Sequence, residues 1–204
     1  MSSKEKVVFT KKDVRDVLNT GVKLFVITSV VCVMLFFVNY VTKDRIAEIE
    51  LTKINNAITA LIGDDEGLHI DKADDYGEKN IKDVYVVTKG DGDDQKVYGY
   101  CVYVTDKGYG GEMDLLVGLT ANGYVSGIEV ISDKETAGIG KKVLSGDFMT
   151  RFNGRGGEVV LGEDGINAVS GATITSKAVT RCVNTVLEFY NSSLKEAETI
   201  ENDQ

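Results

Sequence analysis

The pattern of hydrophobic and polar positions separates one long apolar run from the rest of the chain. Residues 24–41, LFVITSVVCVMLFFVNYV, carry no charge. As a helix rising about 1.5 Å per residue, this run would span about 27 Å, close to the thickness of a bilayer core. A signal peptide would have a shorter apolar region followed by small residues at a cleavage site, and so uniformly apolar a core helix is uncommon in a small domain. The pattern predicts one uncleaved transmembrane helix in a lipid bilayer.

A second helical pattern follows the run directly. Its apolar residues recur at the spacing of one helix face, at Ile46, Ile49, Ile54, Ile58 and Leu61. We therefore predict a juxtamembrane helix over residues 44–62. The polar stretch from residue 63 to residue 83 then predicts a solvated loop.

Strand and helix patterns alternate less regularly in the remaining sequence. Four strands are expected, over residues 84–88, 96–106, 114–120 and 124–132. The last two are joined through Asn122-Gly123, which is a strong hairpin signal. Helices are expected over residues 141–152 and 176–196, the second of them amphipathic. About 160 residues outside the membrane suit one α+β domain, in which helices pack on an antiparallel sheet.

These elements give the chain five consecutive parts. We expect an N-terminal cytoplasmic segment (1–23), the transmembrane helix (24–41), the juxtamembrane helix (44–62), the main domain (63–196) and an acidic tail (197–204).

The distribution of charge predicts the orientation of these parts. The net charge is −9, yet residues 1–43 hold seven Lys/Arg against three acidic residues, and the remainder holds 16 against 29. Six of the basic residues precede residue 24, and basic residues favour the cytoplasmic side of a membrane. We therefore expect a cytoplasmic N-terminus and an extracytoplasmic domain. Because so acidic a domain repels phosphate backbones, no nucleic-acid partner is expected.

Composition argues against several kinds of chemistry. The single histidine, His69, disfavours multi-histidine metal sites and histidine-dependent triads. The cysteines at positions 32, 101 and 182 form no CxxC motif and no even disulfide framework. Proline is missing where about ten would be average, so Gly, Asn and Asp must make the turns. We predict no catalytic or metal-binding side chains and expect a bound group to supply the chemistry.

Three glycine-containing loops are the candidates for holding such a group. They are residues 106–113 (DKGYGGEM), 133–140 (DKETAGIG) and 167–176 (NAVSGATITS). None matches the G-x-G-x-x-G dinucleotide fingerprint or the G-x-x-x-x-G-K-[ST] phosphate loop. The third loop combines small residues with hydroxyls at a predicted helix N-terminus, where free N–H groups can bind a phosphate. From the residues alone, simple capping of the helix by Ser or Thr is the commoner explanation.

The third loop also resembles a known motif. Ser170-Gly171-Ala172-Thr173 is similar to the S-G-A-T flavinylation motif of the FMN-binding domain family. Members of this family that serve as G subunits of Rnf-type complexes share the same order of features. These are one anchor, an acidic exported domain, a G-Y-G-G loop, an E-T-x-G-[IL]-G loop and the motif, and the resemblance covers most of residues 20–195.

The resemblance implies a cofactor and the residues around it. FMN would be joined through its phosphate to Thr173 by a separate flavin transferase that uses FAD and a divalent metal. The implied binding residues are Ser170, Gly171, Ala172 and Thr175 near the phosphate, Glu135, Thr136, Gly138, Ile139 and Gly140 near the ring system, and Tyr109, Gly110 and Gly111 in the same pocket.

The chain departs from the family pattern at two positions. Asn167 stands three residues before the motif's serine, where the family often has Asp, although Asp164 is close in sequence. Ala137 replaces the proline of the usual E-T-P-G-L-G loop. The first change bears on recognition by the transferase, and the second makes the loop less rigid, although its glycines keep their backbone freedom.

The resemblance implies an electron-carrier subunit with covalent FMN in an ion-translocating ferredoxin:NAD+ oxidoreductase. It would sit in the cell membrane beside other membrane subunits, with catalysis belonging to the complex. Two alternatives stay open from the sequence. One is an FMN-carrying subunit of a sodium-translocating NADH:quinone reductase or a free-standing extracytoplasmic flavoprotein. The other is an anchored adhesion or sensor domain without a cofactor.

Overall fold

The structure is a computed structural model that describes residues 11–63, 65–73, 76–90, 95–145, 147–162 and 165–195. The predicted acidic tail, residues 1–10 of the predicted cytoplasmic segment, and Asp164 lie outside these residues. The chain forms two units, residues 1–50 and residues 51–204.

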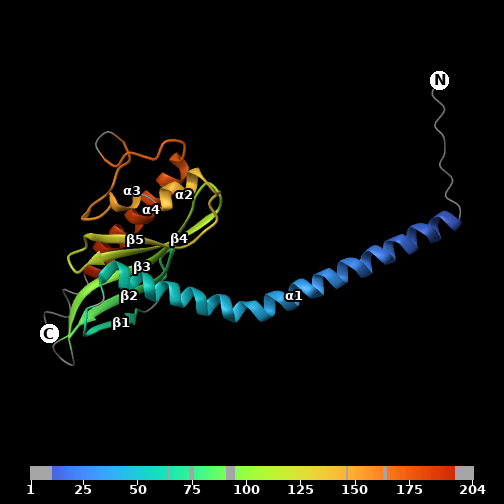
Figure 1. Cartoon of the computed structure of the whole chain (residues 1–204), viewed down its shortest axis with the longest axis horizontal. Helices are drawn as coiled ribbons and strands as arrows, with labels where there is room; N and C mark the ends of the chain where they lie inside the picture. The colour runs from blue at the N-terminus through green and yellow to red at the C-terminus, as the bar shows by residue number, and fades with distance from the viewer. Residues whose placement is uncertain are drawn as a thin grey trace, which may run out of the picture. The chain divides into compact units, whose positions relative to one another are not determined.

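One helix, α1 (Lys11–Ile62), contains both the apolar run and the helical pattern that follows it (Figure 1). No proline interrupts this helix, and its one glycine is Gly21. Between Gly21 and the end of α1 there is therefore no residue with a strong tendency to break a helix. From Arg15 to Ile62 the helix is long and apolar enough to cross a membrane. The Thr28 hydroxyl donates to the carbonyls of Leu24 and Phe25, at 3.0 Å each. Its polar group is thus satisfied within the helix, as a bilayer core requires.

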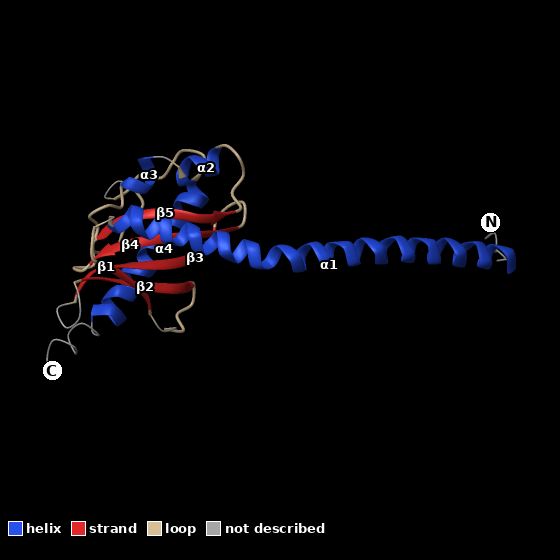
Figure 2. Ribbon diagram, turned by 60° about the horizontal axis from the view of Figure 1, so that its bottom comes forward, coloured by secondary structure: helices blue, strands red, loops and turns tan. Residues whose placement is uncertain are grey.

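The second unit is built on an antiparallel sheet whose five strands lie in sequence order, side by side in Figure 2. The strands are β1 (Leu68–Lys72), β2 (Ile81–Lys89), β3 (Lys96–Lys107), β4 (Glu112–Thr120) and β5 (Val125–Asp133). The four strands expected from the sequence correspond to β2 through β5, with ends that differ by at most a few residues. The predicted hairpin joins β4 to β5, where Gly123 has a φ of 77°.

Strand β1 corrects the prediction of a continuous loop over residues 63–83. It pairs with β2 from Leu68 opposite Lys89 to Lys72 opposite Tyr85. Four of its five side chains are exposed, because it is an edge strand that is held through its backbone rather than through an apolar face. A segment of this kind lacks the apolar pattern on which strand prediction depends.

The helices after the sheet also differ from the expected ones. Residues 141–152 form two short helices, α2 (Ile139–Leu144) and α3 (Asp147–Thr150), instead of a single helix. The final helix, α4 (Thr173–Phe189), begins three residues before the predicted start and continues into a π-helical turn, η2 (Tyr190–Leu194). The early start matters for function, because it places Thr173, the last residue of the S-G-A-T motif, in the first turn of α4, while Ser170, Gly171 and Ala172 lie in the turn before the helix.

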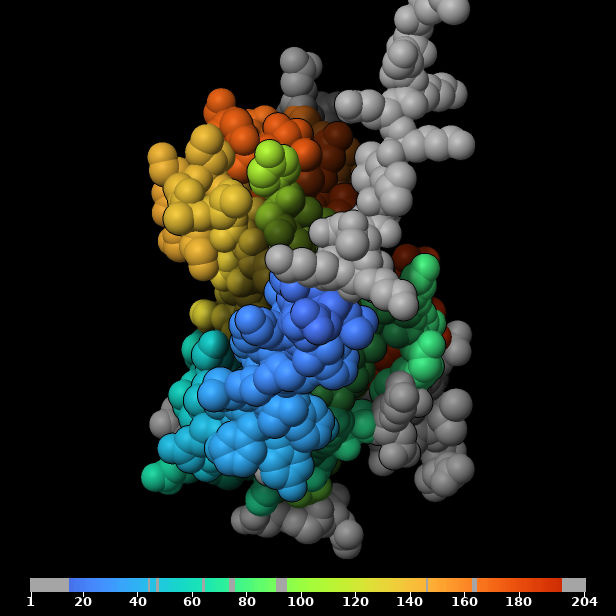
Figure 3. Space-filling model, turned by 90° about the vertical axis from the view of Figure 1, so that its right-hand side faces the viewer, coloured from blue at the N-terminus to red at the C-terminus, as the bar shows by residue number. Residues whose placement is uncertain are grey.

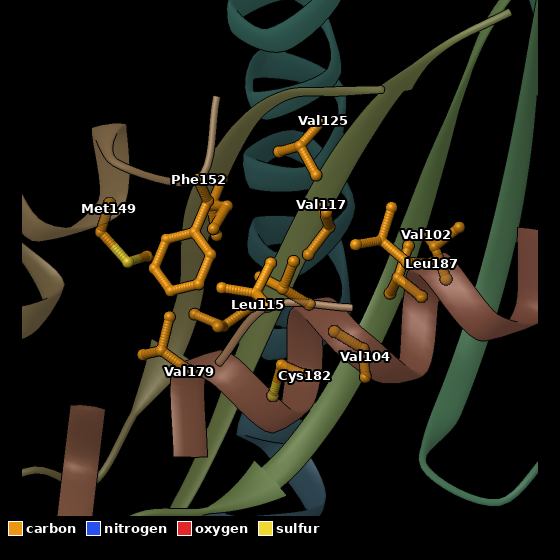
Figure 4. Close-up of a cluster of buried hydrophobic side chains, with 14 of the residues drawn as sticks. Val102, Val104, Leu115, Val117, Val125, Met149, Phe152, Val179, Cys182 and Leu187 are labelled. Carbon is orange, nitrogen blue, oxygen red and sulfur yellow. The ribbon is translucent and has the colours of Figure 1, made fainter. Parts of the chain in front are cut away.

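The sheet has one helix layer on each face. On the face covered by α2, α3 and α4, called here the α4 face, Figure 4 shows Val179, Cys182 and Leu187 of α4 against Val102, Val104, Leu115 and Val117 of the sheet. The opposite face, called here the α1 face, is covered by the last turns of α1. Its buried residues are Ile54, Ala57, Ile58, Tyr85, Val87, Cys101, Tyr103, Leu116 and Ile131.

Candidate functional site

The three glycine-containing loops, far apart in the sequence, meet at one cavity of about 410 Å³. Figure 3 shows their segments side by side at one end of the domain, the first in yellow-green, the second in gold and the third in orange. The cavity is lined by Tyr109, Glu135, Thr136, Ala137, Ile139, Gly140, Gly171, Ala172, Thr173, Ile174 and Thr175. Its volume lies in the range of small-molecule sites, roughly 300–1,000 Å³.

Glu135 connects all three loops through its carboxylate. The backbone N–H of Tyr109 donates to Oε1 at 2.8 Å, and that of Gly110 donates to Oε2 at 3.2 Å. The Thr175 hydroxyl also donates to Oε1, at 3.2 Å. Glu135 is only 7% exposed, so the cost of burying its carboxylate is offset by these charge-assisted hydrogen bonds. They tie the first loop, the second loop and the start of α4 together.

Glycines on two sides make room for this carboxylate. A Cβ atom at Gly140, in α2, would lie 2.5 Å from Oε2, and one at Gly108 would overlap Oε1. Gly110 is needed for a different reason, because its Cβ would collide with the carbonyl of Lys134 and lie 2.8 Å from the Cα of Glu135. Gly110 therefore lets the backbones of the first two loops approach each other, and Gly108 and Gly140 leave room for the Glu135 carboxylate.

The N-terminus of α4 forms the third wall of the cavity. Ala172 precedes the helix and makes no side-chain cap, and no side chain in the described part of the chain accepts a hydrogen bond from the first-turn N–H groups of Thr173, Ile174 and Thr175. Capping by Ser or Thr, the commoner explanation of the motif from the residues alone, does not occur here. Instead, Ser176 accepts a hydrogen bond from the backbone N–H of Val169 at 3.1 Å, and Thr175 bonds Glu135. The free N–H groups and the helix dipole favour an anion at this end.

Two threonines in the first turn of α4 have opposite environments although they are two residues apart. Thr173 is exposed at the cavity, whereas Thr175 is only 1% exposed. Thr173 is therefore open to the cavity and to solvent, and the Thr175 hydroxyl is hydrogen-bonded to Glu135.

Apolar side chains surround the mouth of the cavity. Tyr109 is 69% exposed, and Ile139 and Ile174 are each 53% exposed. Each comes from a different loop, and each lines the cavity. Exposed apolar groups around a concave site are typical of a surface that a planar, partly apolar ligand covers. An anion site at one wall and apolar groups at the others fit a ligand with a phosphate and an aromatic ring system.

The structure brings together most of the residues implied by the resemblance, but not all of them line the cavity. Tyr109, Gly171, Ala172, Thr173, Thr175 and the second-loop residues Glu135, Thr136, Ile139 and Gly140 do so. The residues that do not are Gly110, Gly111, Gly138 and Ser170. Gly138 has a φ of 110° at the start of α2, so its role is in the backbone turn. Ser170 is exposed to solvent and does not line the cavity.

Two lining residues, Ile174 and Ala137, were not among the expected ones. Ile174 follows Thr173 in the first turn of α4 and lines the cavity. The sequence contains one indication of this role. Ile174 is an apolar residue within a run of small and hydroxyl residues, and no apolar residue lies one helical turn before it. Ala137, noted as a departure from the family pattern, also lines the cavity, so this change alters the wall itself.

The segment before the motif is fixed by a basic residue. The Arg151 guanidinium donates to the backbone carbonyl of Asn167 at 2.9 Å and stacks over the ring of Phe148, 5.8 Å from its centroid. The Asn167 side chain itself is exposed. This position is therefore open to recognition by another protein rather than part of the cavity.

Comparison with known proteins agrees with this geometry. A model of the FMN-binding domain matches residues 108–188, a range that includes all the lining residues. The G subunit of the Na(+)-translocating ferredoxin:NAD(+) oxidoreductase complex of Acetobacterium woodii is 32% identical, with 96% of this chain and 100% of the relative aligned. The G subunit of the proton-translocating complex of Clostridium ljungdahlii is also 32% identical, over 74% of this chain and 79% of the relative.

A solved structure is similar over a shorter part. The crystal structure of Shewanella oneidensis NqrC aligns with 54% of this chain and 62% of its own length, at 24% identity and a TM-score of 0.42. The family match and the nearly full-length relatives establish the kinship independently of it. The chain belongs to the family of FMN-binding-domain proteins that includes the G subunits of ion-translocating ferredoxin:NAD(+) oxidoreductase complexes.

Proposed function

We propose that this chain is the FMN-carrying, electron-relaying subunit of a membrane-bound, ion-translocating ferredoxin:NAD(+) oxidoreductase complex. The relatives that cover most of the chain are named as the G subunits of such complexes, and the cavity offers a helix N-terminus for a phosphate and apolar side chains for a ring system. When bound, FMN supplies the redox chemistry, and the protein positions it and tunes its potential. Turnover of ferredoxin and NAD+ then belongs to the complex rather than to this subunit.

We further propose that FMN is attached covalently at Thr173. The observation that carries this proposal is the exposure of Thr173 at the cavity wall, beside first-turn N–H groups that no side chain among the described residues caps. A phosphate held there would be neutralised by N–H donors and by the helix dipole. With FAD as donor, the Thr173 oxygen bonds to the flavin-side phosphorus, the pyrophosphate bond breaks, and AMP leaves while the hydroxyl proton is released. A flavin transferase would catalyse this step.

The other lining residues have distinct roles in this proposal. The small side chains of Gly171 and Ala172 leave space beside the phosphate, and Glu135 fixes the walls. Tyr109, Ile139 and Ile174 provide apolar surface for the ring system. Gly110, Gly111, Gly138 and Ser170 support the loops from outside the lining.

We propose the membrane arrangement expected from the charge pattern. Helix α1 anchors the chain in the cell membrane, with a cytoplasmic N-terminus and an extracytoplasmic domain. The partners are the other membrane subunits and, during maturation, the flavin transferase. Covalent attachment suits this location, because an exported carrier cannot replace a lost cofactor from the cytosol.

Flavin fluorescence in the denatured protein tests the attachment directly. The full chain, co-expressed in membranes with a flavin transferase, is expected to give a fluorescent band on a denaturing gel. Thr173→Ala should abolish the fluorescence, and Thr173→Ser, which keeps a hydroxyl, should retain at least part of it. Thr180→Ala serves as a matched control, since this buried threonine of α4 lies outside the cavity. A fluorescent Thr173→Ala band would disprove attachment at this residue.

A further inference from the structure

We propose that Glu135 has an electrostatic role: its buried carboxylate lowers the reduction potential of the flavin held in this cavity. This inference rests on the proposed function. It concerns a side chain whose contacts have been described so far only as a connection between loops.

The hydrogen bonds of Glu135 are those of an ionised carboxylate. Each of its two oxygens accepts a backbone N–H, from Tyr109 on Oε1 and from Gly110 on Oε2. The hydroxyl of Thr175 adds a third donor on Oε1. An ionised carboxylate only accepts hydrogen bonds, and all three groups that contact these oxygens are donors, so the arrangement matches the charged form.

This carboxylate has no cationic partner among the described residues. Two lysines of the second loop and α2 are engaged with other carboxylates, Lys134 with Glu112 at 3.1 Å and Lys141 with Asp133 at 3.0 Å. The remaining lining residues bear no carboxyl or basic group. The three donors therefore reduce the negative charge of Glu135 without neutralising it.

A negative charge at the wall of a partly enclosed cavity opposes the addition of electrons to a ligand inside. The effect is larger than in water, because the apolar walls and the low local dielectric screen the charge poorly. Glu135 therefore holds the reduction potential of the bound flavin below the value that a neutral side chain would give. The charge of this residue would thus be one of the protein's means of tuning its cofactor.

Potentiometric titration of the flavin-loaded full chain tests the proposal. Glu135→Gln keeps the size of the side chain and removes the charge, so it should favour reduction about tenfold, a positive shift of about 59 mV for a one-electron couple. Glu112→Gln is the matched control. It removes one acidic charge within the first loop, from a side chain that is 70% exposed and does not line the cavity, and it should leave the potential unchanged.

A second variant keeps the proposal testable if Glu135→Gln does not acquire flavin. Thr175→Val retains the carboxylate and removes one of its donors, so the charge is less compensated and the potential should fall. General loosening of the cavity would move both variants in the same direction, whereas an electrostatic role moves them in opposite directions.

The outcomes separate this inference from the proposed function. If the native chain carries no flavin after co-expression with the transferase, the proposed function fails. If it carries flavin and the Glu135→Gln potential equals the native one, or if Thr175→Val raises the potential, the electrostatic role of Glu135 is overturned.

Discussion

Both faces of the sheet are buried, but they are built differently. On the α4 face, neighbouring strands present large aliphatic side chains, such as Val102, Leu115 and Val117, to helices from later in the chain. On the α1 face, glycines in three strands lie where the end of α1 approaches. A Cβ at Gly99 would lie 3.0 Å from Ile62 Cδ1, and at Gly118 it would lie 3.0 Å from Leu61 Cβ.

This difference shows how the fold separates attachment from ligand binding. Gly127 of β5 is the third of these glycines, since its Cβ would lie 2.8 Å from Leu61 Cδ2. Gly99, Gly118 and Gly127 together form a shallow trough on the α1 face, called here the glycine trough. A helix seated in such a trough fits closely to the strands. The helices of the α4 face are shorter and begin near one end of the sheet, where their loops surround the cavity. The α1 face fixes the end of the anchor helix, and the α4 face holds the site.

Deleting one large side chain from each face is the strongest way to test this comparison. Leu115 and Leu116 are adjacent in β4, fully buried, and on opposite faces. Alanine at either position should lower the free energy of unfolding by about 2–5 kcal/mol. Native-state hydrogen exchange should then separate the two variants.

The expected exchange pattern is specific to each face. Leu115→Ala should speed exchange mainly in α4, and Leu116→Ala mainly in residues 54–62 of α1. The same pattern of faster exchange in both variants would contradict the division into two separately packed faces.

Replacing a glycine by alanine should have a smaller effect on stability, and this effect should differ between the cavity and the glycine trough. Gly110→Ala places a Cβ against backbone atoms of the second loop, which cannot move aside, and should cost about 1–3 kcal/mol in unfolding free energy. Gly127→Ala meets only the end of the flexible Leu61 side chain, so a smaller loss is expected. Covalent flavin content should fall in the first variant and stay at the native level in the second. The prediction fails if Gly127→Ala loses flavin as severely.

The sequence predicts the larger elements of the fold because their signals are local. The apolar run, the amphipathic pattern of α4 and the Asn122-Gly123 turn each depend on neighbouring residues. Strand β1 escapes prediction because its side chains face solvent and its pairing with β2 is distant in sequence. The break between α2 and α3 near Ser145 overrides a helical pattern, and the next residue, Gly146, has low helix propensity.

The candidate site can be predicted in part from the sequence, but through resemblance to a family motif rather than through residue spacing or periodicity. The motif residues and the second loop were implied by the family pattern, and the structure places most of them at one cavity. The hydrogen bond between Thr175 and Glu135 joins residues that are 40 positions apart. No spacing rule reveals such a contact, and so the connecting role of Glu135 becomes visible only in the fold.

Each face also buries one cysteine, and these two thiols make the stability of each face depend on pH. Burial raises the pKa of Cys101, on the α1 face, and of Cys182, on the α4 face, to about 12 from the ordinary value near 9. The unfolded chain therefore releases the thiol protons first. The stability contributed by each protonated thiol is complete below pH 9 and is lost as pH rises from about 9 to about 12, by about 1.4 kcal/mol per pH unit.

Denaturant unfolding of the full chain in detergent, at pH values from 8 to 10.5, measures this loss. Cys101→Ala and Cys182→Ala should each remove one share of the pH dependence, while titration of lysines and tyrosines remains as a common background. An unchanged slope in either variant would show that its thiol does not contribute. Below pH 8 both thiols should also react slowly with alkylating agents, because the thiolate is the reactive form.

The smallest expected effects concern the ion pairs at the edges of the two faces. Arg181 of α4 donates from Nε to Asp106 at 2.7 Å and from a terminal nitrogen to the carbonyl of Lys107 at 3.3 Å, which ties α4 to the first loop. Its side chain is 55% exposed, so Arg181→Gln should cost less than about 1 kcal/mol in unfolding free energy. Lys89 pairs with Asp65 at 2.8 Å near the end of β2, between two exposed side chains.

Lys89→Gln should therefore cause no measurable loss of stability, and comparison of the two variants at low and high salt tests the reason. Salt should remove part of the Arg181 effect, because ions screen the exposed part of its interaction with Asp106. The hydrogen bond to the Lys107 carbonyl should persist, since it joins the guanidinium to a neutral group. If the whole effect disappeared in salt, Arg181 would be an ordinary surface charge, and Glu135 and Thr175 would be left as the main connection between α4 and the first loop.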